Sequence, residues 1–111
     1  MLYTEPMCEN YLFRKLYHRG KSYVCPYFVL YAMKNKSGCN RLGITTGKKI
    51  GGAVARNRAR RLLRETYRLA EPRLAAGYDL VLVARTRLTA AKRTAVAPFF
   101  DEGISALGIG R

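Results

Sequence analysis

Arginine side chains dominate residues 48–68. This segment carries eight basic residues and one acidic residue, so its net charge of +7 is half of the +14 of the whole chain. On a helix with about 100° between residues, one arc holds Arg56, Asn57, Arg60, Arg61, Arg64 and Arg68. The opposite arc holds Ala55, Ala59, Leu62, Leu63, Thr66 and Ala70, and Arg58 lies near the border beside Glu65. One side of this predicted helix therefore packs on the protein, and the other is a ridge of guanidinium groups.

The spacing of these arginines favours an anion-binding surface. Arg56, Arg60, Arg64 and Arg68 form a like-charged series four residues apart, which costs helix stability unless an anion is present. Glu65 can pair with Arg61 or Arg68, but one carboxylate does not neutralise the ridge. Lys48 and Lys49 precede the helix, where free backbone N–H groups also favour phosphate. The alternative is an ordinary solvated charged face, for which alternating signs are more typical.

The composition of the whole chain agrees with a polyanionic partner. The 111 residues include 21 Lys and Arg against seven Asp and Glu, and fourteen of the cations are arginines, whose planar fork suits phosphate. A helix whose polar side chains are almost all arginine binds phosphates and recognises the shape of a nucleic acid rather than the edges of its bases. The aromatic residues Phe13, Tyr17, Tyr27 and Tyr31 could stack on unpaired bases, and packing in the core is the alternative for each. Structured RNA with a single-stranded element is the predicted ligand.

The titratable residues do not suggest a catalyst. His18 is the only histidine and lies next to Arg19, as expected for a surface residue. Asp79 and Asp101 are the only aspartates, and Glu102 points about 100° away from Asp101 on a helix. A metal-dependent nuclease needs converging carboxylates, and a metal-free nuclease needs a paired acid and base. We expect no catalytic residue and no metal site in the polypeptide.

The remaining composition excludes several other classes of protein. Cys8, Cys25 and Cys39 form no C-x-x-C pair, so we expect free thiols in a reducing cytoplasm rather than a zinc site. The chain has no apolar run of about eighteen residues and no secretory signal at its N-terminus. A cytoplasmic location is therefore expected.

The chain reads as one RNA-binding domain over residues 1–111, with residues 1–10 and 108–111 expected to be flexible. Apolar spacing predicts a first helix over residues 7–19, ending at Gly20. Strands are predicted at residues 22–25, 27–33, 41–46 and 78–85, with Pro26 marking the first as an edge strand. The arginine helix begins after Gly51 and Gly52 and ends before Glu71, and a last helix begins at Thr89 or Thr94 and ends at Leu107, before a glycine-rich tail. This order predicts an α+β sandwich with helices packed on a central sheet.

Alternation divides the strand at residues 27–33 into two faces. Phe28, Leu30 and Ala32 point one way. Tyr27, Val29, Tyr31 and Met33 point the other way, and the hydroxyls of the two tyrosines favour water or a polar ligand. We expect the second face to be available for binding.

The arginine segment resembles the RNR motif of the bacterial ribonuclease P protein family. The motif residues here are Lys48-Lys49-Ile50-Gly51, Ala53-Val54, Arg56-Asn57-Arg58, Arg60-Arg61 and Arg64. The similarity extends from Leu12 to about Leu107. It includes Phe13, Tyr17 and Gly20 in the first helix, Phe28-Val29-Leu30-Tyr31 in the central strand, and Gly77-Tyr78-Asp79 with Ala84-Arg85 in the last strand. Glu5 and Glu9 stand where family members often have a basic stretch.

The resemblance implies a protein subunit that assists a catalytic RNA in removing the 5′ leader of precursor tRNA. The fold implied is like one domain of a small-subunit ribosomal protein, in α-βββ-α-β-α order, with a left-handed βαβ crossover. The leader-binding residues implied are Phe13, Tyr17, Val29, Tyr31, Asn57, Arg60 and Arg64. The residues implied to contact ribonuclease P RNA are Lys48, Lys49, Arg56, Arg58, Arg61 and Arg68. Mg²⁺ would be held mainly by RNA, with no membrane and no obligate protein partner.

Two other functions fit parts of the same pattern. A ribosomal or other structural RNA-binding protein would have the same composition and charge, and only the RNR spacing and the aromatic residues argue against it. A protein-only nuclease would require carboxylates that the sequence lacks.

Overall fold

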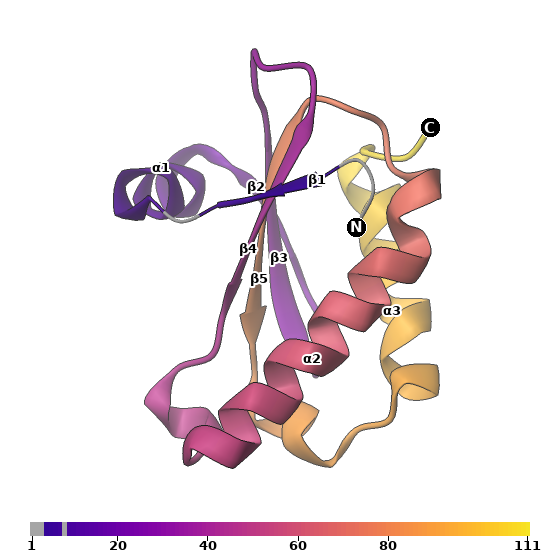
Figure 1. Cartoon of the computed structure of the whole chain (residues 1–111). Coiled ribbons are helices and arrows are strands. Elements are labelled where there is room, and N and C mark those ends of the chain that lie inside the picture. Colours follow the sequence, from indigo (N-terminus) through magenta and orange to yellow (C-terminus); the bar gives the residue numbers. More distant parts are fainter. Residues whose placement is uncertain (1–3, 8) are drawn as a thin grey trace.

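The computed structural model describes residues 4–7 and 9–111 as three helices on a five-stranded sheet (Figure 1). The strands are β1 (Thr4–Pro6), β2 (Lys21–Val24), β3 (Phe28–Lys34), β4 (Asn40–Thr45) and β5 (Tyr78–Ala84). The helices are α1 (Asn10–Arg19), α2 (Ala53–Ala70) and α3 (Arg93–Leu107), with 3₁₀ turns η1 (Lys48–Ile50), η2 (Glu71–Arg73) and η3 (Thr86–Ala90). The α+β class and the order of the predicted elements are confirmed, and β1 is an additional strand before them.

The sheet has the order β1-β4-β5-β3-β2. β3 is antiparallel to β2 and β5, whereas β4 runs parallel to both β1 and β5. The parallel strands β4 and β5 are joined through α2, so the segments that follow both strands meet at one end of the sheet, beside the start of α2 (Figure 1). β2 lies at an edge, as Pro26 predicts.

The two faces of the sheet carry different helices. In Figure 1, α1 lies on one side of the sheet, and α2 and α3 lie on the other. Phe28, Leu30 and Ala32 belong to the larger core under α2 and α3. Tyr31 and Met33 pack against the smaller core that Leu12 and Leu16 form under α1. The predicted division is confirmed for residues 28–33, but the predicted place of Tyr27 is wrong: Tyr27 precedes β3 and packs against the larger core instead.

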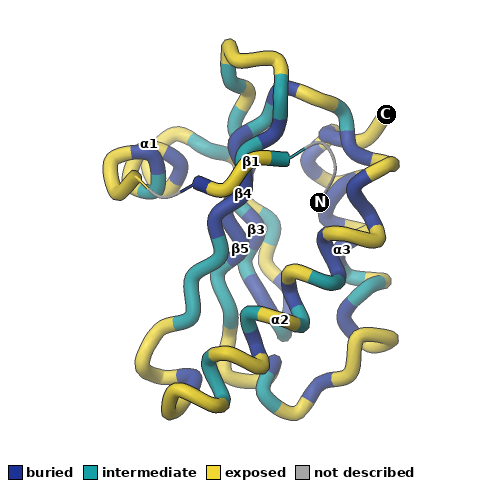
Figure 2. The backbone as a smooth tube through the Cα atoms, in the orientation of Figure 1, coloured by how far each residue is buried: buried dark blue, intermediate teal, exposed yellow. Residues whose placement is uncertain are grey.

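The buried face of helix α2 includes the predicted residues but extends further round the helix than predicted. Ala59, Leu63, Thr66 and Ala70 are buried as expected, but Tyr67 is also buried at 0% exposure, although it falls within the arginine arc. Its ring packs edge-on against Phe100 of α3 at 6.0 Å between centroids. Contact with α3 therefore extends the buried arc toward the arginines, and Arg56 and Arg60 are half-buried at its border. Figure 2 shows buried and exposed positions alternating along α2.

The prediction that the first helix begins near residue 7 is wrong. Thr4–Pro6 pair with β4, and the Met7 amide continues this ladder by donating to the Leu42 carbonyl at 2.8 Å. Helix α1 begins three residues later at Asn10 because the chain is still extended at Met7.

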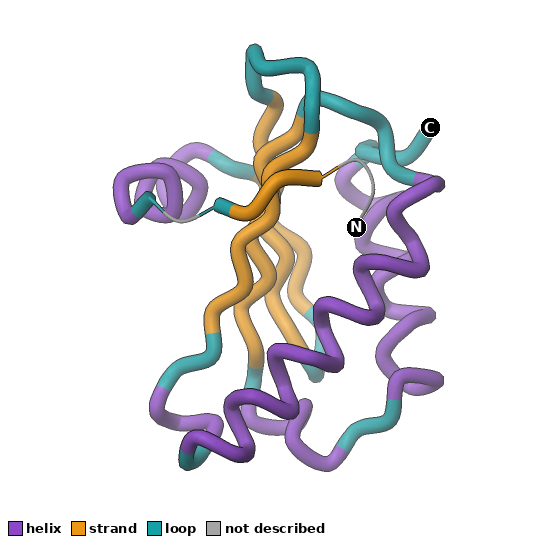
Figure 3. Tube along the Cα trace, viewed as in Figure 1, coloured by secondary structure: helices purple, strands orange, loops and turns teal. Residues whose placement is uncertain are grey.

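The last helix begins at Arg93, close to the second of the two predicted starts, and residues 86–90 form the separate turn η3 (Figure 3). Gly108 ends α3 in the left-handed conformation at φ 66°, which glycine adopts without strain. The tail then turns back, Ile109 is buried, and Gly110 bridges Leu74. None of the helices in residues 4–7 and 9–111 is long and apolar enough to cross a membrane.

Candidate nucleic-acid interface

An aromatic wall lies between α1 and the sheet, with Phe13 and Tyr17 on α1 and Tyr31 on β3. The rings of Tyr17 and Tyr31 meet edge-on with centroids 5.0 Å apart, and Phe13 and Tyr31 both pack against the small core under α1. Burial raises the pKa of the Tyr17 hydroxyl, while a hydrogen bond with Thr45 acts in the opposite direction. Tyr17 nevertheless remains 42% exposed, so its ring is available to a ligand.

A hollow of about 470 Å³ lies at the edge of this wall. It is lined by Asn10, Phe13, Arg14 and Tyr17 of α1 and by Thr45 at the end of β4. Strand register places Thr45 beside Val83, which pairs in turn with Val29. The partly buried side chain of Val29 therefore lies on the face of the sheet that α1 covers, two residues before Tyr31 on the same strand.

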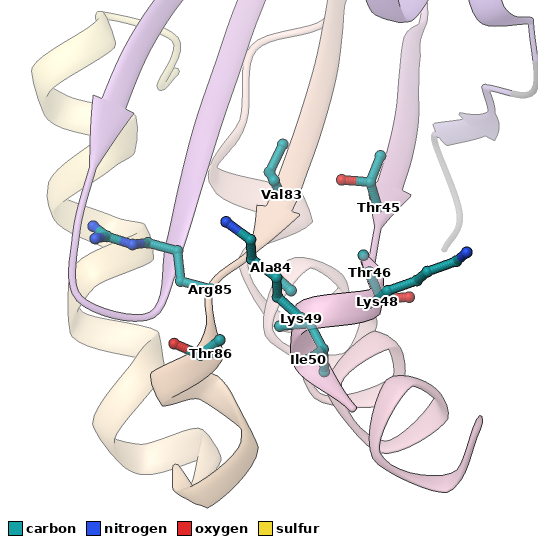
Figure 4. A pocket seen from close by; sticks show the side chains of 10 residues that line it. Thr45, Thr46, Lys48, Lys49, Ile50, Val83, Ala84, Arg85 and Thr86 are labelled. Atoms are coloured by element: carbon teal, nitrogen blue, oxygen red, sulfur yellow. The ribbon is translucent and has the colours of Figure 1, made fainter. Parts of the chain in front are cut away.

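A second hollow of about 610 Å³ opens where β4 and β5 end (Figure 4). Its lining residues are Thr45, Thr46, Gly47, Lys48, Lys49, Ile50, Val83, Ala84, Arg85 and Thr86. Figure 4 shows the Lys49 side chain extending across the hollow, with Lys48 and Arg85 pointing away on opposite sides. Arg85 donates to the Cys25 carbonyl at 3.0 Å, which fixes its guanidinium near the β2–β3 turn.

Two further hollows follow the arginine side of α2. One of about 180 Å³ is lined by Thr46, Ala53, Arg56, Asn57 and Arg60. The other, of about 510 Å³, is lined by Val54, Asn57, Arg58, Arg60, Arg61 and Arg64. Consecutive hollows share Thr45, then Thr46, then Asn57 with Arg60. Together they form one groove, which we call the β4-end groove, from the aromatic wall to the arginine ridge.

Arg60 is held against the end of β4. Its guanidinium donates to the Ile44 carbonyl at 3.2 Å and to the Thr46 hydroxyl at 3.1 Å. β1 pairs only with Asn40, Arg41 and Leu42, so it does not cover this part of the β4 edge. Arg60 therefore satisfies an edge carbonyl while its position in the groove is fixed.

Arg58 points to the other side of α2. Its guanidinium donates to the carbonyls of Thr89 and Ala91, in and just after turn η3. Arg58 and Arg60 thus tie α2 to the segments that follow β5 and β4, respectively. These two segments also form walls of the 610 Å³ hollow.

The other ridge residues differ in their partners. Arg61, Arg64 and Arg68 are exposed, and Arg56 is half-buried. Of the two partners predicted for Glu65, the structure pairs Arg68, whose guanidinium donates to the carboxylate at 2.6 Å and 3.0 Å. That pair lowers the pKa of Glu65, whereas Arg56, Arg60, Arg61 and Arg64 form no ion pair within the described residues.

The structure brings most of the predicted leader-binding residues to the β4-end groove. Phe13 and Tyr17 line its first hollow, Tyr31 contacts Tyr17, and Asn57, Arg60 and Arg64 line the hollows on α2. Tyr27, a fourth aromatic candidate, instead packs edge-on against Phe99 at 5.6 Å. Sequence reasoning did not predict several polar lining residues, among them Asn10, Arg14, Thr45, Thr46, Arg85 and Thr86. Thr45 and Thr46 give no sequence signal because only the pairing of β4 with β5 brings them beside Val83.

Comparison with known proteins identifies the family. The family model described as Ribonuclease P matches residues 4–107. The chain belongs to the ribonuclease P protein family. Members of this family are the protein component of ribonuclease P, a ribonucleoprotein endonuclease that acts in tRNA 5′ maturation.

Individual relatives agree with this assignment. The chain is 49% identical over 79 residues to the ribonuclease P protein component of Natranaerobius thermophilus, covering 71% of this chain and 69% of that protein. It is 50% identical over 83 residues to that of Clostridioides difficile, covering 74% and 73%. The RNase P protein from Thermotoga maritima superposes with a TM-score of 0.78 at 28% identity, covering 93% and 94%. A Staphylococcus aureus RNase P protein mutant with defective mRNA degradation activity superposes with a TM-score of 0.83 at 27% identity, covering 94% and 88%.

Carboxylates of this ribonuclease P protein are used in internal contacts. Asp79 is 1% exposed and accepts two hydrogen bonds from Arg41, at 2.7 Å and 2.8 Å. Asp101 pairs with Arg73, and Glu65 pairs with Arg68. Across residues 4–7 and 9–111, no three His, Cys, Asp or Glu side chains converge as a metal site.

Cys25 and Cys39, the two cysteines that the structure describes, line none of the four hollows. Cys25 is free and buried, and burial raises the pKa of its thiol. Cys39 is free on the β3–β4 turn, where its sulfur lies 3.6 Å from the Ser37 hydroxyl. Cys8 lies outside the described residues.

Proposed function

We propose that the β4-end groove binds the single-stranded 5′ leader of precursor tRNA. Phe13, Tyr17 and Tyr31 would stack with unpaired bases, and Val29 would extend this apolar surface along the sheet. Asn57, Arg60 and Arg64 would contact the backbone as the strand passes onto α2. This division suits a single strand, which offers bases on one side and phosphates on the other.

The observation that carries the proposal is the sharing of residues between consecutive hollows. Thr45 belongs to the aromatic hollow and to the 610 Å³ hollow, and Thr46 belongs to the 610 Å³ hollow and to one beside α2. Stacking groups and phosphate-binding groups therefore lie along one path. Two unconnected patches would be as compatible with a structural RNA-binding protein as with a leader-binding protein. One continuous path favours the binding of an extended single strand.

The remaining basic residues are assigned to ribonuclease P RNA. Arg61 and Arg68 are exposed on α2, and Lys48 is at the rim of the 610 Å³ hollow with its side chain pointing away from it. Lys49 and Arg56 line hollows beside the start of α2, so they lie where leader and catalytic RNA would meet. Arg58 belongs to the same set, although its guanidinium already binds two carbonyls of the protein.

Mg²⁺ supplies the chemistry of cleavage in the holoenzyme and is assigned to RNA. Within residues 4–7 and 9–111 no three His, Cys, Asp or Glu side chains converge to hold a metal ion, and Asp79, Asp101 and Glu65 are each paired with an arginine. The contribution of the protein is to hold the leader in an extended path and to lower repulsion between RNA backbones. Both effects act on substrate binding rather than on bond breaking.

Reconstitution tests this function. The purified protein is mixed with ribonuclease P RNA from its host at low Mg²⁺, and 5′ processing of a precursor tRNA is measured with each component alone and with both. We expect cleavage to require both components under these conditions. Tight RNA binding without stimulation of cleavage would instead support a structural RNA-binding role.

A further inference from the structure

A second basic surface lies on the side of α1 that faces away from the sheet. Leu12 and Leu16 are buried against the sheet, whereas Arg14, Lys15, His18 and Arg19 are exposed, as is Tyr11. Figure 2 shows exposed positions on the part of α1 that is farthest from the sheet. At about 100° per residue, these five exposed side chains fall within an arc of about 140°. We call them the outer face of α1.

The charges of this face have no partner among the residues that the structure describes. Within residues 4–7 and 9–111, none of the cationic side chains of α1 forms a hydrogen bond or ion pair. Lys15 and Arg19 are four residues apart and repel each other, which costs helix stability. His18 and Arg19 in the last turn suit the helix dipole, but Arg14 and Lys15 are one turn earlier, where this effect has faded. An external anion would offset the repulsion.

An exposed aromatic residue lies among these charges. Tyr11 is 57% exposed and precedes Arg14 and Lys15 by three and four residues, so all three side chains occupy neighbouring positions on the helix. An aromatic ring surrounded by cations is the combination that binds unpaired bases together with their phosphates. A contact with an RNA duplex would use the cations but not the ring.

The position of Arg14 connects the outer face of α1 to the β4-end groove. Arg14 lines the hollow that also contains Phe13 and Tyr17. α2 lies on the opposite side of the sheet, so the outer face of α1 is separate from the arginine ridge (Figure 1). A strand that leaves the groove past Arg14 reaches Tyr11 and Lys15 next.

We propose that the outer face of α1 binds a second, unpaired RNA segment, with a base on Tyr11 and phosphates on Lys15 and Arg19. This inference extends the proposed leader groove and rests on that function for its biological setting. The same chemistry has two sources: the leader beyond the groove, and an unpaired segment of ribonuclease P RNA.

Two variants and a matched control test this proposal in the full chain. Lys15→Gln/Arg19→Gln removes two charges, Tyr11→Ser removes the ring, and Lys34→Gln/Lys36→Gln removes two exposed charges from the β3–β4 segment. Affinities are measured for ribonuclease P RNA alone. With the holoenzyme, they are measured for precursor tRNA whose leader ends inside the groove and for precursor tRNA whose leader extends beyond it. Circular dichroism and thermal unfolding confirm that each variant is folded.

We expect each outer-face variant to lose about fivefold or more in affinity for one ligand, and the control to lose less. The slope of log affinity against log salt should be shallower by about 1.4 in the Lys15→Gln/Arg19→Gln variant, because two fewer phosphates of a single strand are neutralised. A loss confined to the long leader identifies the leader as the ligand, and a loss for ribonuclease P RNA identifies the catalytic RNA. Outer-face variants that match the control on every ligand would overturn the proposal. A wild-type holoenzyme that binds mature and precursor tRNA equally would instead count against the leader groove alone.

Discussion

The ring of Phe13 lies directly over Gly43, so that a Cβ atom at Gly43 would stand 2.5 Å from the Cζ atom of Phe13. Gly43 is on β4 in register with Val81, under the small core of α1. The absence of a side chain at Gly43 therefore sets how closely α1 approaches the sheet, and with it the width of the first hollow of the groove.

Gly43→Ala should displace Phe13 and move α1 away from the sheet. We expect a loss of about 1–3 kcal/mol in the free energy of unfolding, typical of overpacking, and weaker binding of leader-bearing tRNA. Gly47→Ala is the control, because a Cβ atom there meets nothing within 4 Å and φ is −75°. Urea unfolding of both variants measures the difference, and equal stability of Gly43→Ala and Gly47→Ala would contradict the role given to Gly43.

Arg58 should behave as a structural residue as well as an RNA ligand. Its planar guanidinium reaches the Thr89 and Ala91 carbonyls together, which a lysine ammonium cannot reproduce. Arg58→Lys keeps the charge, yet we expect it to cost about 1 kcal/mol of stability and to speed amide exchange in residues 86–91. Arg61→Lys, at an exposed position on the same helix, should change neither. If Arg58 contacts RNA alone, both variants will unfold like the wild type.

The buried Tyr67 hydroxyl should make stability depend on alkaline pH. Burial raises its pKa to about 12 from an ordinary value of 10.0. Below pH 10 the hydroxyl is neutral in both states. Between pH 10 and 12 the unfolded chain releases the proton first, so stability falls by about 2 kcal/mol from this group. In Tyr67→Phe the loss of stability between pH 10 and 12, measured by thermal unfolding, should be smaller than in the wild type. Tyr23, whose pKa is also raised to about 12, contributes to the loss in both the variant and the wild type. An unchanged pH profile would refute this assignment.

Patterns within single elements predicted much of the fold and the groove. The alternation in β3 correctly separated Leu30 from Tyr31, and the arginine period placed α2 with its ridge facing solvent. Contacts between elements escaped prediction because no local pattern encodes them. Tyr67 is buried only because α3 packs beside it, and Thr45 lines the groove only because β4 pairs with β5. The short strand β1 also depends on a distant partner, since three residues carry no period of their own.

Binding of RNA should depend steeply on salt. On the ridge, Arg56, Arg61 and Arg64 form no ion pair within the described residues, whereas Arg68 is paired with Glu65. We expect the logarithm of the affinity to fall by roughly 0.7 to 0.9 per log salt for each phosphate neutralised. Arg64→Gln should reduce this slope by about one phosphate, and Arg68→Gln by less, because Glu65 already offsets its charge. Filter binding between low and moderate salt measures both slopes, and a flat response of the wild type would contradict the arginine ridge as an RNA surface.

Tyr31→Ala and Arg64→Ala should weaken the binding of leader-bearing precursor tRNA more than that of mature tRNA. Tyr31 supports the ring of Tyr17 at 5.0 Å, so its removal damages stacking at one end of the groove, whereas Arg64 supplies charge at the other end. Loss of one stacked base corresponds to about 1–3 kcal/mol, or at least a fivefold change in affinity for precursor tRNA. Tyr27→Ala is the aromatic control, because Tyr27 packs on Phe99 rather than in the groove. Equal losses for precursor and mature tRNA in the Tyr31 and Arg64 variants would show that the leader does not follow the β4-end groove.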